Sequence, residues 1–159
     1  MAITTMVGAR IHRREDPRLV SGHGRYADDF LRTHAAHLAV VRSPHAHARV
    51  RSIDVTEALK APGVVAVLTA ADFKKVLSGN MPVAPAFVAE KKQAPDRFPI
   101  AEREVSFQGE PVAVVVADSK YQAADGAELV SVDWEPLPAV MDLEKAMEAG
   151  SPKAHEGAA

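Results

Sequence analysis

The chain has 159 residues, of which 47% are apolar and 25% charged, and its net charge is −2, as in an ordinary globular domain. The lack of a basic excess argues against a nucleic-acid partner, and the absence of cysteine excludes disulfides, thiolate metal sites and iron–sulfur ligation by this chain. No apolar run approaches the ~20 residues of a membrane helix and no secretory leader opens the sequence, so we expect a cytoplasmic protein without a membrane partner.

Residues 1 to about 33 form a polar segment that we expect to be an extended, irregular arm. Gly22 and Gly24 interrupt any helix, and arginines alternate with acidic residues. A segment this polar cannot bury enough apolar surface to order itself, so it either lies on something larger or is a flexible terminus. Both interpretations are open. The arginines are Arg10, Arg13, Arg14, Arg18, Arg25 and Arg32.

The next part of the chain predicts strands that alternate with short helices. The predicted strands cover 35–41, 48–54 and 64–68, and the predicted helices cover 54–60 and 70–77. Pro44 ends the first strand because proline has no amide hydrogen for a sheet. Asp54 and Glu57 predict a capping box for the first helix, and Thr69 caps the second. The third strand is an uninterrupted apolar run, which is typical of a strand covered on both faces.

The second half repeats this alternation after a proline-rich loop over 78–99. The predicted strands cover 104–107, 112–117 and 131–134, and the predicted helices cover 118–130 and 142–149. Asp118 or Ser119 caps the longer helix, and Asp142 with Gly150 delimits the last one. The whole pattern predicts an α+β (mixed α/β) domain with a mixed sheet, short helices and the extended arm.

Four histidines crowd into fourteen positions and are the first candidates for a metal site: His34, His37, His45 and His47. Imidazole is a common metal ligand, but a complete site needs three or four convergent ligands. Nothing in the spacing fixes that convergence. We therefore interpret these histidines as surface or hydrogen-bonding residues.

Other catalytic arrangements are weaker. A nucleophilic triad could be drawn from Ser43, His45 and Asp54. Their closeness in sequence says little about the geometry of their side chains. A carboxylate pair for general acid–base catalysis could be drawn from Glu102, Glu104 and Glu110, but glutamates of this kind are found on any exposed strand edge. Glu110 has some interest because Gly109 and Pro111 hold its turn rigidly. The glycines around His23 resemble a dinucleotide fingerprint only superficially, since no apolar strand precedes them.

Two stretches are more specific: Val41–Val50 (VRSPHAHARV) and Gly109–Ala117 (GEPVAVVVA). Each joins an apolar run to polar residues that a generic strand does not need. With further matching stretches in the same order, they resemble the amino-terminal a/b hammerhead domain of molybdenum hydroxylase large subunits. That family includes aldehyde oxidases, xanthine dehydrogenases and aerobic carbon monoxide dehydrogenases. The further stretches are 13–29, 52–54, 62–72 and 130–140.

The resemblance implies an oxidoreductase that oxidises aldehydes, purines or related heterocycles with oxygen from water, or oxidises carbon monoxide. It implies a molybdopterin cytosine dinucleotide-type molybdenum cofactor, with iron–sulfur clusters and FAD on other modules or subunits. In this family the pterin-binding residues and the catalytic glutamate lie in later domains. The resemblance therefore implies no catalytic, cofactor-binding or metal-binding residue in this chain.

The implied organisation is an arm over 1–33, a hammerhead domain over 34–150 and a linker over 151–159 toward a molybdenum-cofactor domain. The chain is then either an excised fragment or the product of a split gene. Its role would be assembly with the cofactor domains and the iron–sulfur and flavin subunits. The residues expected at that interface are Arg14, Arg18, Arg42, His45 and Glu110. The alternative function is a stand-alone hammerhead binding module without redox activity.

Overall fold

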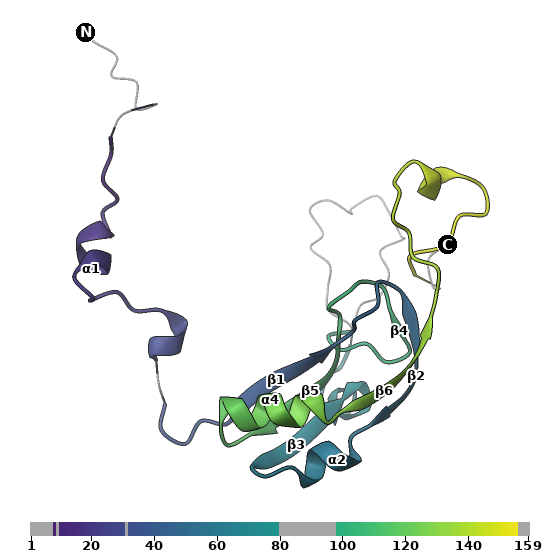
Figure 1. The fold of residues 1–159 in the computed structure, drawn as a ribbon, viewed down its shortest axis with the longest axis horizontal. Helices are drawn as coiled ribbons and strands as arrows, with labels where there is room; N and C mark the ends of the chain where they lie inside the picture. The colour runs from purple at the N-terminus through teal and green to yellow at the C-terminus, as the bar shows by residue number, and fades with distance from the viewer. Residues whose placement is uncertain (1–7, 9, 31, 80–97, 156–159) are drawn as a thin grey trace. The chain divides into compact units, whose positions relative to one another are not determined.

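The computed structural model describes residue 8 and residues 10–30, 32–79 and 98–155 (Figure 1). The chain divides into two units, Met1–Ala35 and Ala36–Ala159. The expected loop over 78–99 lies almost entirely outside the described residues. The expected boundary near residue 33 stays a prediction about domains. Within the described residues, no helix is long and apolar enough to cross a membrane.

The first unit contains more regular structure than its composition predicts. Helix α1 (Asp16–Val20) begins where the Asp16 carboxylate accepts a hydrogen bond from the Arg13 amide at 3.1 Å. It ends at a left-handed Gly22 (φ 74°), and the His23 amide donates to the Arg18 carbonyl at 3.0 Å. Glycine at this position is typical of a helix C-terminus. A 3-10 turn, η1 (Ala27–Asp29), follows.

Within its described residues, the second unit has six strands in two antiparallel sheets of three. The first sheet has the order β1 (His37–Arg42), β5 (Pro111–Ala117), β3 (Val64–Thr69). The second has the order β4 (Glu104–Val105), β2 (Ala48–Asp54), β6 (Ser131–Pro136). Short helices connect the strands: α2 (Thr56–Lys60), α3 (Ala70–Phe73) and α4 (Lys120–Glu128). The α+β class predicted from the sequence is confirmed, but the predicted mixed sheet was wrong, because all four described strand pairs are antiparallel.

Strand β5 is the centre of the core. Five of its seven residues are buried, and the side chains on its two faces pack in different apolar clusters. Ala113 and Val115 pack with residues of α2 and β3, whereas Val114 packs on the opposite side with Ala70 and Ile100. The prediction that the 64–68 run is covered on both faces is confirmed for Val67 and Leu68, which pack in the clusters on opposite faces of the sheet. Val65 is 64% exposed because it lies at a register shift between β3 and β5.

Helix α4 lies along β1 and β5, and a glycine allows its close approach (Figure 1). A Cβ at Gly126 would lie 2.8 Å from Val64 Cγ2 and 3.0 Å from Val115 Cγ1. Glycine weakens a helix interior by about 1 kcal/mol relative to alanine. Here that loss is offset by contact between the α4 backbone and two strands. Ser119 caps the helix, as predicted, and its hydroxyl accepts from the Gln122 amide.

Several predicted helix ends were wrong. The N-cap of α2 is Val55, and the Asp54 carboxylate instead accepts from the Thr56 amide at 2.9 Å. Helix α3 ends at Phe73, although its predicted cap is present: the Asp72 carboxylate accepts from the Thr69 amide at 3.0 Å.

The last predicted helix, 142–149, contains only a 3-10 turn, η3 (Lys145–Met147). No residue of η3 is buried. Helices this short depend on tertiary packing, and η3 has none to extend it. Two strand lengths differ from the prediction by two residues, since β4 is only two residues long and β6 continues to Pro136.

Candidate functional site

The turn between β1 and β2 joins the two sheets and contains the most specific sequence motif. Its first residue, Ser43, is only 3% exposed. The Ser43 amide donates to the Glu110 carbonyl at 2.9 Å, and the Gly109 amide donates to the Ser43 carbonyl at 2.8 Å. The Ser43 hydroxyl accepts from the His45 amide at 3.0 Å and donates to the His45 carbonyl at 2.9 Å. The first two bonds fix the turn against the loop that precedes β5, and the two bonds of the Ser43 hydroxyl hold the turn itself.

Arg42 and Glu110, two of the predicted interface residues, meet at this loop. Arg42 Nη1 donates to the Gly109 carbonyl at 2.8 Å. Gly109 has φ 91°, a left-handed conformation that favours glycine. The Glu110 carboxylate accepts from the Ser106 amide. Arg42 therefore ties the end of β1 to the loop before β5, and Glu110 holds that loop together. The Arg42 side chain is also exposed.

His45, the third predicted residue of this turn, contacts the second sheet. Its ring lies edge-on to Trp134 of β6, with ring centroids 5.5 Å apart and an interplanar angle of 65°. Edge-to-face pairs of this kind are favourable for aromatic rings. The half-buried imidazole therefore fixes the turn to β6 while part of it faces solvent.

His47 is a buried, hydrogen-bonding residue, as the sequence interpretation allowed, but its partners were not predicted. Its Nδ1 lies 2.8 Å from the Pro138 carbonyl oxygen and its Nε2 lies 2.7 Å from Glu104 Oε1. A carbonyl only accepts, so Nδ1 carries a hydrogen. The contact at Nε2 then needs a second proton, either on the imidazole, making it cationic, or on the carboxyl group. The two side chains together hold one proton more than a neutral imidazole beside a carboxylate.

This pair is well shielded from water, since the side chains of His47 and Glu104 are 7% and 12% exposed. It ties β2 to β4 and both to the chain leaving β6. The Leu137 amide also donates to the His47 carbonyl at 3.0 Å. The sequence signal was the cluster of four histidines that includes His45 and His47. Its partner lies 57 positions later, so only the strand pairing reveals it.

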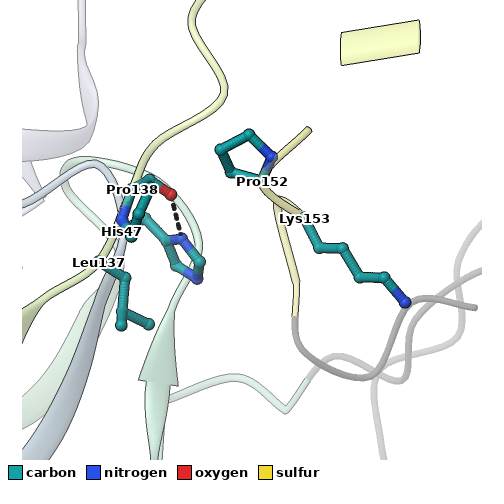
Figure 2. A pocket seen from close by; sticks show the side chains of 5 residues that line it. All are labelled: His47, Leu137, Pro138, Pro152 and Lys153. Carbon is teal, nitrogen blue, oxygen red and sulfur yellow. Dashed lines mark hydrogen bonds between the residues drawn. The ribbon is translucent and has the colours of Figure 1, made fainter. Parts of the chain in front are cut away.

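An open depression of about 420 Å³ lies beside His47 (Figure 2). It is lined by His47, Leu137, Pro138, Pro152 and Lys153. Figure 2 shows the imidazole bonded to the Pro138 carbonyl on one wall, with Pro152 and Lys153 on the returning chain opposite. The lining is mostly apolar. The depression therefore offers a surface for a protein segment more readily than a polar reaction site.

The two remaining predicted interface residues, Arg14 and Arg18, lie in the Met1–Ala35 unit. Arg14 is exposed. Arg18 Nη2 lies 3.8 Å from Glu15 Oε1, and both side chains are largely exposed. An ion pair this exposed contributes little to stability. Both guanidinium groups are accessible to another surface.

The catalytic arrangements considered from the sequence are not assembled. The Ser43 hydroxyl bonds to the backbone of His45, and Asp54 bonds to Thr56 at the far end of β2. Three carboxylates bind three separate partners: Glu102 binds Lys74, Glu104 binds His47 and Glu110 binds the Ser106 amide. The Lys74 ammonium lowers the pKa of Glu102. Across the described ranges, no group of three or more His, Cys, Asp or Glu side chains is placed to hold a metal ion.

Comparison with known proteins identifies the fold. A family model described as "Aldehyde oxidase and xanthine dehydrogenase, a/b hammerhead domain" matches residues 21–138. The carbon monoxide dehydrogenase large chain of Afipia carboxidovorans is 45% identical over 150 residues, which are 94% of this chain and 18% of that one. The xanthine dehydrogenase molybdenum-binding subunit of Escherichia coli O157:H7 is 33% identical, covering 87% of this chain and 18% of the subunit.

A solved structure agrees with these matches. Quinoline 2-oxidoreductase from Pseudomonas putida 86 superposes with a TM-score of 0.79 and 41% identity, over 94% of this chain and 18% of that chain. The chain thus spans about 18% of the length of the relatives it matches. The match includes the Ser43–His47 turn and the strands that hold it.

Proposed function

This chain belongs to the a/b hammerhead domain family of aldehyde oxidases and xanthine dehydrogenases, and we propose that it is the hammerhead part of the large subunit of a molybdenum-dependent oxidoreductase. In that role it supplies assembly surfaces and no reacting group. The observation that carries this proposal is the use of the polar side chains at its most specific motif. Ser43, His47 and Glu110 of the two specific stretches all bond within the domain, His47 to Glu104 of β4, and none of these bonds leaves a group arranged for a reaction.

The molybdenum cofactor is proposed to lie outside this chain. One relative is named a molybdenum-binding subunit, and the chain matches only 18% of it. The described residues lack a convergent ligand set, and the whole sequence lacks cysteine, so these residues do not fit a metal or iron–sulfur site. The proposed holoenzyme carries a molybdopterin cytosine dinucleotide-type cofactor on its remaining large-subunit domains. Iron–sulfur clusters and FAD would lie on further modules or subunits.

The relatives are named as large chains and subunits, which makes them parts of multi-subunit proteins. We propose that this chain contacts its neighbours through Arg42 at the end of β1, His45 in the β1–β2 turn and Glu110 in the loop before β5, and through Arg14 and Arg18. The arm, the hammerhead body and a linker after residue 150 would be its three functional segments. A cytoplasmic location is part of the same proposal. The stand-alone binding module has no comparable support.

The first experiment is co-purification of this chain from its native cell extract, with molybdenum quantified in the same fraction. The proposal expects the chain to travel with a molybdenum-containing large-subunit region, on the same polypeptide or another. A chain that runs alone and free of molybdenum would contradict it and favour the stand-alone module.

A second experiment tests the arm. Charge reversal in Arg14→Glu or Arg18→Glu should weaken assembly without unfolding the domain, because both side chains are exposed. Lys120→Glu, at an exposed position on α4, is the control with the same change of charge. Size-exclusion chromatography measures assembly and circular dichroism measures folding. Assembly unchanged by all three substitutions would remove the arm from the interface.

A further inference from the structure

The segment that follows β6 exposes three large apolar side chains within seven residues. Met141 is 84% exposed, Leu143 is 88% exposed and Met147 is 90% exposed. Single exposed apolar residues are common on any protein, but a contiguous group of this kind marks an interaction surface. Methionine suits such a surface because its flexible thioether adapts to a partner's shape.

Hydrogen bonds within the same segment hold it in shape. The Asp142 carboxylate accepts from the amides of Glu144 and Lys145 at 3.0 and 3.3 Å, and the Ala146 amide donates to the Asp142 carbonyl at 3.0 Å. The Ser151 hydroxyl donates to the Lys145 carbonyl. The bonds of Asp142 and Ser151 therefore hold the segment in a defined conformation while Met141, Leu143 and Met147 stay exposed.

The segment also has a concave side. A depression of about 260 Å³ is lined by residues that include Val140, Met141, Ala146 and Pro152. Its lining is predominantly apolar, and it lies next to the exposed methionine. A partner can therefore both receive the projecting side chains and fill this depression. Figure 1 shows the turn η3, in yellow, standing off from the sheets.

We infer that residues 139–150 form a docking surface for the remaining part of the large subunit, the part proposed to carry the molybdenum cofactor. The segment begins where the match to the hammerhead family model ends, at residue 138. The relatives are more than five times longer than the matched region, since it covers 18% of them. The segment contains Asp142, Glu144 and Glu148 against a single cation, Lys145. The surface that covers it is therefore apolar at its centre and basic at its rim.

This inference rests on the proposed function, and thiol protection in the assembled protein tests it. The chain has no cysteine, so Leu143→Cys and Met147→Cys each introduce its only thiol. Tyr121→Cys is the control, because Tyr121 is a large side chain on α4 that is 73% exposed. Each variant is prepared in the assembled, molybdenum-containing protein. Maleimide labelling of the introduced thiol is followed by mass spectrometry of its peptide, in native buffer and in guanidinium.

The expected result is that Leu143→Cys and Met147→Cys react at least about tenfold more slowly in native buffer than in guanidinium, since labelling would require opening of the interface. Tyr121→Cys should react at similar rates in both. If the assembly forms but both segment thiols react at their denatured rates, the docking surface is refuted and the proposed function stands. If no molybdenum-containing assembly exists, both are refuted.

Discussion

Replacing His47 by alanine should destabilise the domain by about 3 kcal/mol, because removing one member of a buried, hydrogen-bonded pair leaves the other without compensation. The imidazole makes one bond to the Pro138 carbonyl and one to Glu104, at 2.8 and 2.7 Å. Breaking a buried ion pair from one side costs about 3–5 kcal/mol. We take the low end because Glu104 keeps 12% exposure, so water can reach the carboxylate that remains.

Glu104→Gln separates the charge of this pair from its hydrogen bond. A glutamine amide can donate to Nε2 of a neutral imidazole whose Nδ1 still donates to Pro138, so the geometry needs no additional proton. The loss should then be only about 1 kcal/mol, the charge-assisted part of the bond. In the double variant His47→Ala/Glu104→Ala, the destabilisation should fall short of the sum of the single losses by about 1.5 kcal/mol or more.

The assay is urea unfolding followed by tryptophan fluorescence and circular dichroism. Trp134 is the only tryptophan and lies in β6, next to the ring of His45, so its emission reports on the sheet that the pair stabilises. Additive losses, within about 0.3–0.5 kcal/mol, would show that His47 and Glu104 do not interact in the folded domain. That result would refute the argument that the His47 imidazole bonds to Glu104 through Nε2 while it bonds to Pro138 through Nδ1.

Two further predictions concern stability away from the turn. Gly126→Ala should lower the free energy of unfolding, measured in urea, by about 1 kcal/mol. The added methyl group would overpack against the stiff side chains of Val64 and Val115, and this cost exceeds the gain in helix propensity. Equal or greater stability of the variant would contradict the close approach of α4. The bond from the Thr69 amide, with Lys75 nearby, lowers the pKa of Asp72 from 3.8 to about 2. The stability that the ionised Asp72 carboxylate contributes is therefore present above the unfolded-state pKa of 3.8 and is lost as pH falls through the folded-state pKa of about 2. Asp72→Asn should lower the urea midpoint at pH 7 and lower it much less at pH 2.

Most strands could be predicted from the sequence because alternation and proline positions are local signals. The central role of β5 could not, because the runs 64–68 and 112–117 are equally apolar. Only the pairing of β5 with both β1 and β3 separates the middle strand from the edge. The prediction of a helix over 142–149 was wrong for a related reason. Asp142 does cap a turn, but a cap cannot extend a helix that packs against nothing.

The candidate site could be predicted only in part. The sequence singled out Arg42, His45 and Glu110, and the structure brings Arg42 and Glu110 together at the Gly109 turn. Their contact with another subunit stays a prediction. His47 was interpreted as a surface or hydrogen-bonding residue, but its partners could not be identified because they follow it by 57 and 91 positions. Local spacing contains no information about contacts that depend on the pairing of β2 with β4 and on the path after β6.

The order of strands in the first sheet has a consequence for biosynthesis. Neither β1 nor β3 has a partner until β5, which is the last of the three to be translated and lies between them. During translation two apolar strands therefore wait with unpaired edges, the condition in which strands pair wrongly with other chains. Contacts this distant in sequence also form slowly. The nascent domain is thus most vulnerable to aggregation before residue 117 leaves the ribosome, and most dependent on chaperones in that interval.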